Sequence, residues 1–341
     1  MSPPPPAARR TRPPAGGRVF GALNVLGVYG LVGGLFALGC AISREFISPD
    51  NLMNALRAVT LLGIVAVGLA FVTYSRHYVD LSIPGIMALS GTVAVWALKF
   101  GFVPSLAIGL AVGALVGLVN GLVIGYLRLN PIIWTLAMMS LLSGVIRWAY
   151  AGRQIYPDKA TAAGRAFLEL YHHRLLGLLP LPVAVLLAVA AGGYFLMRHT
   201  GYGARLKLTG SAYEVARLTG INVRRAVAGA FVISSLTSAA AGVLLTSFNK
   251  VGAVYIGGGY DFRTITAVVL GGMTLAGGRG SIVGVLGGVA AIALMNNVMS
   301  LVRVGQFVLG DFQQNIVQGA VFILVVGINS FARRRTGGDD A

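Results

Sequence analysis

Long apolar runs, each as long as a membrane-spanning helix, make up most of this chain, and short breaks containing charged residues, Gly or Pro separate them. About 20 apolar residues in a helix span the hydrocarbon core of a bilayer. The runs lack the two-residue alternation of a β-barrel strand. The sequence therefore predicts an all-α, polytopic membrane protein of about ten transmembrane segments. The expected segments are residues 19–43, 54–73, 83–99, 103–127, 131–150, 180–199, 226–248, 263–278, 282–303 and 312–331.

Composition supports this class, because hydrophobic residues make up 56% of the chain and charged residues only 11%. A soluble domain could not cover such a composition with a polar surface. The formal charge of +17 does not indicate nucleic-acid binding, since the basic residues lie mainly at the ends of the apolar runs. There they set topology and contact lipid headgroups. Membrane lipid is thus an expected partner and nucleic acid is not.

The charge distribution predicts the orientation of the chain. Lys and Arg are more frequent in the inter-span segments that share a side with the N-terminus, so both termini are expected in the cytoplasm. Residues 1–18 are Pro-rich and basic and are expected to form a disordered cytoplasmic tail. A single transmembrane domain, 19–331, and a second cytoplasmic tail, 332–341, complete the expected organisation.

The most charged loop, 200–226, is expected on the cytoplasmic side. It contains five basic residues and a single acid, Glu214. Within it we expect a helix over residues 211–219, with Ser211 as the N-cap and Gly220 as the C′ residue. The basic residues are Arg205, Lys207, Arg217, Arg224 and Arg225.

Two features stand out within the apolar part. The stretch 80–85 opens the third span, and Asp80 or Ser82 could cap its helix. The stretch 257–288 is rich in glycine, which permits close helix packing or interrupted helices along a transport path. Packing and capping alone remain an equal alternative for both. The two stretches also begin similar runs, which indicates a weak internal repeat.

Several kinds of chemistry have no motif in the sequence. The stretch 277–281 lacks the Lys of a P-loop, and no HExxH, GxSxG or cysteine–histidine metal spacing occurs. We therefore expect no catalytic residue, no cofactor and no metal site. The carboxylates Asp80, Asp261 and Asp311 fall at the ends of expected spans, which argues against a proton-coupled pump.

Five stretches together resemble the membrane permease subunits of ribose-type ABC importers, within the wider branched-chain amino acid permease group. The resemblance covers about residues 50–331. Residues 79–91 resemble the family's "GIDLSVGS…ALSG", and residues 267–280 with Asn296 and Asn297 resemble "AAVVLGGTSLAGGKG…NN". Residues 113–121, 130–136 and 210–221 carry the other three similarities.

The resemblance implies a neutral sugar as solute, a pentose such as ribose above all. It implies a bacterial inner-membrane permease that pairs with a second permease subunit, most simply as a homodimer. Cytoplasmic ABC ATPase subunits would drive it, and a periplasmic solute-binding protein would deliver the solute. A stand-alone secondary transporter of small polar solutes is the alternative.

The resemblance also implies roles for particular residues. In the ATPase-coupling loop, Glu214 would make a polar contact with the ATPase and Ala216 would pack into its groove. The remaining residues of that loop would be Gly210, Gly220 and Ile221. The candidate pathway or structural-turn residues are Asp80, Ser82, Asn120, Trp134, Gly271, Gly272, Asn296 and Asn297.

Overall fold

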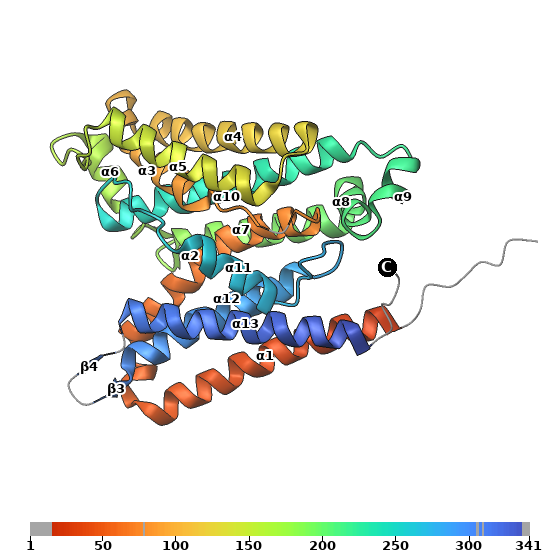
Figure 1. The fold of residues 1–341 in the computed structure, drawn as a ribbon. Coiled ribbons are helices and arrows are strands. Elements are labelled where there is room, and N and C mark those ends of the chain that lie inside the picture. The colour runs from red at the N-terminus through yellow and green to blue at the C-terminus, as the bar shows by residue number, and fades with distance from the viewer. Residues whose placement is uncertain (1–15, 78, 305–306, 309, 336–341) are drawn as a thin grey trace, which may run out of the picture.

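The computed structural model describes residues 16–77, 79–304, 307–308 and 310–335, and these are mostly helical (Figure 1). Among them, eight helices are long and apolar enough to cross a membrane, which confirms the expected class. These eight are α1 (Gly16–Ile42), α2 (Pro49–Tyr74), α3 (Ile83–Ala97), α4 (Phe102–Leu127), α5 (Pro131–Ala149), α7 (Leu181–His199), α10 (Val223–Asn249) and α12 (Ile282–Leu301). The helix α13 (Asp311–Arg335) is also long, but its apolar part, Gln313–Gly327, is shorter. The shorter elements are η1 (Arg44–Ile47), η2 (Leu98–Phe100), α6 (Ala162–Leu170), α8 (Gly201–Ser211), α9 (Tyr213–Leu218), α11 (Tyr260–Leu270) and the hairpins β1 (Arg174–Leu175) with β2 (Leu179–Pro180) and β3 (Arg303–Val304) with β4 (Phe307–Val308).

Capping residues set several helix starts. Ser48 Oγ accepts from the Asn51 amide at 3.3 Å, and Asn130 Oδ1 accepts from the Ile132 amide at 2.9 Å. Pro follows both caps in the first turn of the helix, where its missing N–H has no cost. These local signals explain why most expected spans begin within a few residues of the observed helices.

One face of α4 packs directly on the backbone of α10 through a ladder of glycines. A Cβ on Gly121 would lie 2.6 Å from Ala228 Cα, and one on Gly117 would lie 2.8 Å from the Phe231 carbonyl oxygen. Residues four apart share a helix face, and small residues let membrane helices approach closely. The two helices therefore touch along most of their length. The ladder comprises Gly113, Gly117, Gly121 and Gly125, and Gly109 on the same helix packs on the Ser90 carbonyl of α3.

Two irregular stretches enter the bundle from opposite ends. Residues 75–82 follow α2 and lead into α3, whereas residues 250–259 follow α10 and lead into α11. The helices α2 and α10 are antiparallel, because Arg57 lies over Phe248 at one end and the His77 ring faces Phe231 toward the other. The two stretches therefore start at opposite ends of the bundle, and the internal repeat expected from the sequence stays a prediction.

The second stretch reaches deep into the bundle along α3. A Cβ on Gly252 would lie 3.1 Å from Thr92 Cα, and one on Gly257 would lie 3.3 Å from the Pro84 carbonyl oxygen. Pro84 is in the first turn of α3, so the stretch meets the place where the first stretch ends. Irregular backbone at membrane depth is stable only where protein or a hydrated cavity surrounds it.

The expected span 263–278 is wrong as a continuous helix. The helix α11 has 11 residues and so extends about 16 Å, roughly half of the hydrocarbon thickness. It ends because Gly272 takes a left-handed conformation with φ of 83°. A loop over 271–281 then leads to α12.

Figure 1 places the start of α1, the end of α13 and the pair α8–α9 at the same end of the bundle. This end is called the α9 end below. Residues 1–15 and 336–341 of the two expected tails lie outside the described residues. The helices α1 and α13 extend into the expected tails, because α1 begins at Gly16 and α13 continues to Arg335.

Candidate functional site

The expected helix over 211–219 is wrong at its start. The loop forms two helices, and Ser211 is the last residue of α8 rather than an N-cap. The Ala212 amide donates to the Leu208 carbonyl at 2.9 Å, which continues the helical bonding of α8 past Ser211. The N-cap of α9 is Ala212, which has no side-chain oxygen to cap the helix.

The expected C-terminus at Gly220 is confirmed. Gly220 has φ of 78°, and its amide donates to the Arg217 carbonyl at 3.2 Å. The Ile221 amide donates to the Ala216 carbonyl at 3.1 Å. These two bonds form a Schellman motif, in which a glycine at C′ adopts the left-handed conformation without steric cost. The chain therefore leaves α9 in a fixed direction.

The side chains of α9 point in two directions. Ala216 is fully buried within the chain, so it cannot fill a groove on another subunit as expected. Its neighbours Val215 and Leu218 are 51% and 86% exposed. Glu214 is exposed beside Arg217, with 3.9 Å between the charged atoms. The exposed surface of α9 thus combines two apolar side chains with one weak ion pair.

The α8–α9 pair is tied firmly to the bundle. The Gly278 amide donates to the Tyr74 carbonyl at 3.0 Å, and a side chain at Gly210 would overlap both of these groups. On α8, the Tyr202 hydroxyl donates to the Ala226 carbonyl at 3.0 Å. The ends of α2 and α8 therefore contact the loop before α12, and α8 is also bonded to the start of α10, so displacement of α9 would be transmitted to the spans.

A second group of expected residues forms one buried hydrogen-bond chain inside the bundle. The Trp134 indole N–H donates to Asn120 Oδ1 at 2.9 Å, and Asn120 Nδ2 donates to Ser82 Oγ at 2.9 Å. The Ser82 hydroxyl donates to Asp80 Oδ1, which also accepts from the Ser82 amide at 3.0 Å. The chain connects α5, α4 and the irregular stretch before α3.

This geometry corrects the expected helix cap. Ser82 occupies the N-cap position of α3, but neither its side chain nor that of Asp80 bonds to a first-turn amide of α3. Both carboxylate oxygens of Asp80 have partners elsewhere, because Ser234 Oγ on α10 lies 3.4 Å from Oδ2. Asp80 is fully buried and holds the stretch before α3 against α10.

We expect Asn120→Leu to destabilise the protein by about 2 kcal/mol, because it leaves the Trp134 N–H without its acceptor and removes the donor to Ser82 Oγ. Thermal unfolding of the purified protein in detergent measures this effect. The control Asn54→Leu changes an exposed asparagine of α2 and should leave stability nearly unchanged. Equal stability of the two variants would contradict a structural role for the hydrogen-bond chain.

The other four expected residues lie apart from this chain. Asn297 exchanges two side-chain hydrogen bonds with Asn51, 2.8 and 2.9 Å long, which join α12 to α2. Asn296 accepts from Gln318 of α13 at 2.7 Å. Gly271 ends α11 where its backbone packs on α12, and Gly272 provides the left-handed turn. Their observed contacts join helices.

Sequence reasoning missed four residues that complete these contacts: Thr135, Ser234, Asn51 and Gln318. Thr135 Oγ1 accepts from the Leu81 amide at 3.1 Å. The hydroxyl-rich run 234–238 within an otherwise apolar span was a signal that could have identified Ser234. No local pattern identifies Asn51, because its partner Asn297 is 246 positions away.

Residues 51–326 match the family described as the branched-chain amino acid transport system / permease component. The chain belongs to this family. The match includes both the hydrogen-bond chain and the α8–α9 pair. Several relatives have names that specify sugars, and no solved structure matches the chain.

The relatives cover nearly the whole chain. The ribose import permease protein RbsC of Bacillus subtilis (strain 168) is 35% identical, over 86% of this chain and 89% of its own. The L-arabinose ABC transporter permease protein AraH of Azospirillum brasilense is 33% identical, over 98% of this chain and 95% of its own. The xylose transport system permease protein XylH of Escherichia coli (strain K12) is 28% identical, over 85% of this chain and 87% of its own.

Proposed function

We propose that this family member is the membrane subunit of an ABC importer for a neutral sugar, with a pentose such as ribose as the solute. A periplasmic binding protein delivers the sugar, and separate ATPase subunits hydrolyse ATP. The proposal that a separate ATPase drives transport rests on α9, a short helix with an exposed apolar surface. Apolar side chains exposed beside charged ones are typical of a surface that another protein covers.

The interior suits an uncharged, hydroxyl-rich solute. The buried acid Asp80 is enclosed by hydroxyl and amide donors. In the described part of the chain, several buried hydroxyl groups have no hydrogen-bond partner, and a sugar could provide one in another conformation of the protein. These groups belong to Ser90, Thr92, Ser235, Thr246 and Thr264. Relatives named for ribose, arabinose and xylose support the pentose class.

In this proposal the α9 end faces the cytoplasm, and two copies of the chain form the pathway in the bacterial inner membrane. The excess of Lys and Arg at this end supports the orientation. Closure of the ATPase pair would push α9, and the contacts of Gly210 and Tyr202 would pass the movement to α2 and α10. The spans would then switch between outward and inward openings.

Reconstitution tests the proposal. The chain and its ATPase are reconstituted into proteoliposomes, and a binding protein loaded with labelled ribose, xylose or arabinose is added. At least one pentose should accumulate, and only when ATP is present on the side of the membrane where the ATPase lies. Uptake should stop when either partner is omitted. Uptake by the chain alone, driven by an ion gradient, would contradict the proposal and establish the secondary-transporter alternative.

A further inference from the structure

A hollow of about 270 Å³ at the α9 end has cationic walls. It lies between the end of α7, the helix α8 and the start of α12. Figure 1 shows the loop before α12 beside α8 at this end. We call it the 198/207 pocket, after its two cations. The residues that matter are Tyr194, Arg198, Lys207, Gly280, Ser281 and Ile282.

Among the described residues, the two cations of the pocket have no acidic partner. Arg198 donates to the Tyr194 hydroxyl at 2.6 Å, and Lys207 Nζ donates to the Met197 carbonyl at 2.8 Å. Within the described residues, the ion pair found is between Arg217 and Glu214, on α9. Burial, and then the charge of Arg198, lower the pKa of Lys207. Two cations held together without a carboxylate favour a bound anion.

The start of α12 adds a third positive wall. Ser281 Oγ caps only the Gly284 amide, at 2.9 Å. The amides of Ile282 and Val283 are first-turn groups, which have no acceptor inside the helix. The partial positive charge of a helix N-terminus attracts anions, phosphate in particular. Arginine, lysine and free amides are together the donors that a phosphate group binds best.

The position of the pocket identifies the source of the phosphate. Arg198 is in the last turn of α7, one of the apolar spans, and Lys207 is on the helix that follows it. Near the same end of α7, the side chains of Tyr194 and Phe195 are 38% and 58% exposed. Exposed aromatic residues near the end of a span lie at headgroup level in a membrane. The pocket is therefore at the depth of lipid phosphates.

We propose that the 198/207 pocket binds the phosphate of an anionic phospholipid in the leaflet at the α9 end. The lipid headgroup bridges α7, α8 and the start of α12. Because α8 continues into α9, a lipid in this position holds the base of α9 against the bundle. The assignment depends on the pocket and the membrane setting, and not on which solute is transported.

The test measures lipid binding to the purified full chain in detergent, by native mass spectrometry and by thermal shift. The probes are dioleoyl-phosphatidylglycerol, dioleoyl-phosphatidylcholine and inorganic phosphate. We expect phosphatidylglycerol to bind at least about tenfold more tightly than phosphatidylcholine, because only the former has net negative charge. The double variant Arg198→Gln/Lys207→Gln should lose about tenfold in affinity.

Two further variants make the result specific. Arg205→Gln/Arg225→Gln removes the same charge from exposed positions outside the pocket and should bind phosphatidylglycerol like the wild type. Lys207→Arg keeps the charge and should retain binding. Equal loss in the Arg205/Arg225 variant, or no preference over phosphatidylcholine, would overturn the assignment. Binding of inorganic phosphate without binding of phosphatidylglycerol would also overturn it, in favour of a soluble phosphate ligand.

Discussion

Replacing Gly121 by leucine is expected to leave no folded protein after solubilisation. The first carbon of the new side chain would lie 2.6 Å from Ala228 Cα and 2.7 Å from its carbonyl oxygen. Both are backbone atoms of α10, so no change of rotamer relieves the overlap, and the helices α4 and α10 would have to separate. Overpacking of a well-packed core alone costs typically 1–3 kcal/mol (a rough range), and separation of two helices costs more. Fluorescence-detected size-exclusion chromatography measures the monodisperse fraction.

Gly144→Leu is the matched control. Gly144 is also in the interior of a membrane helix, α5, but a Cβ there would meet nothing within 4 Å. Both substitutions raise intrinsic helix propensity by about 1 kcal/mol, so any difference between them reports helix packing. We expect a normal elution profile for Gly144→Leu. A normal profile for Gly121→Leu would mean that α4 and α10 are not in backbone contact.

Leu218→Asp should abolish ATP-dependent uptake while leaving the membrane part intact. The Leu218 side chain is 86% exposed on α9, so the change disturbs no internal packing. Under the proposed function it would place a charge in the centre of the ATPase contact, where a desolvated, unpaired charge is strongly unfavourable. We expect the ATPase to co-purify at least about tenfold less well, which corresponds to about 1.4 kcal/mol.

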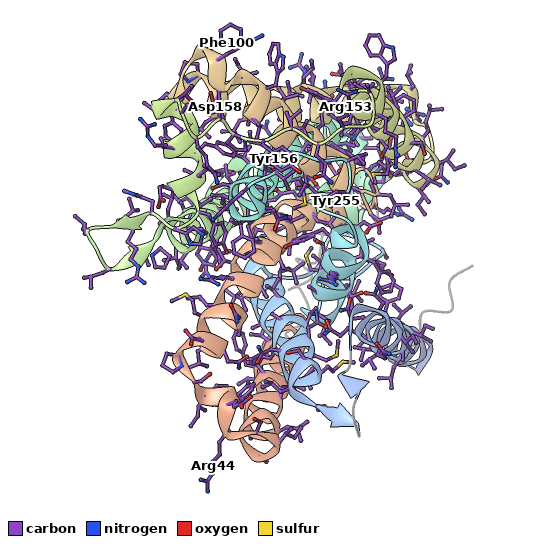
Figure 2. All side chains as sticks on the ribbon, turned by 90° about the vertical axis from the view of Figure 1, so that its left-hand side faces the viewer. Arg44, Phe100, Arg153, Tyr156, Asp158 and Tyr255 are labelled. Atoms are coloured by element: carbon purple, nitrogen blue, oxygen red, sulfur yellow. The ribbon has the colours of Figure 1, made fainter. Side chains whose placement is uncertain are left out.

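Leu178→Asp provides the comparison, because Leu178 is 84% exposed and lies in the hairpin before the start of α7, away from α9. Figure 2 shows the end of the bundle opposite α9, where the labelled Arg44, Phe100 and Asp158 lie. Co-purification of the ATPase should be unchanged in this variant. If both variants retained the ATPase, α9 would not be its contact; if both lost it, the effect would be one of general stability.

Much of the fold could be predicted because membrane helices are encoded locally. The Pro residues at the starts of α2 and α5 and the glycine after α9 each mark a boundary by their own backbone geometry. The helix α11 could not be predicted in the same way. Residues 263–278 are apolar enough to span, but the left-handed turn at Gly272 ends the helix, and Gly277 and Gly278 are left-handed as well.

The sequence singled out candidate residues but could not predict their geometry. Asp80, Ser82, Asn120 and Trp134 were expected individually, and the structure joins them in one chain of hydrogen bonds. That connection depends on three helices meeting, which no local pattern encodes. Ala216 shows the converse: its position in the loop was correct, but the direction of its side chain depends on how α9 packs against the bundle.

The glycine ladder between α4 and α10 has a consequence for how such a protein can move. Sliding one helix past the other by a single residue would bring bulky neighbours such as Val116 or Leu122 against the α10 backbone. Only the hydrogen atom of a glycine fits there. The two helices must therefore travel as one rigid body during any transport cycle. The joints that open and close have to lie at interfaces formed by longer side chains, such as the contact of Phe322 on α13 with Phe262 on α11, or between copies of the chain. Labels that report distance changes should be placed across those joints, and a pair across α4 and α10 would serve as the fixed reference.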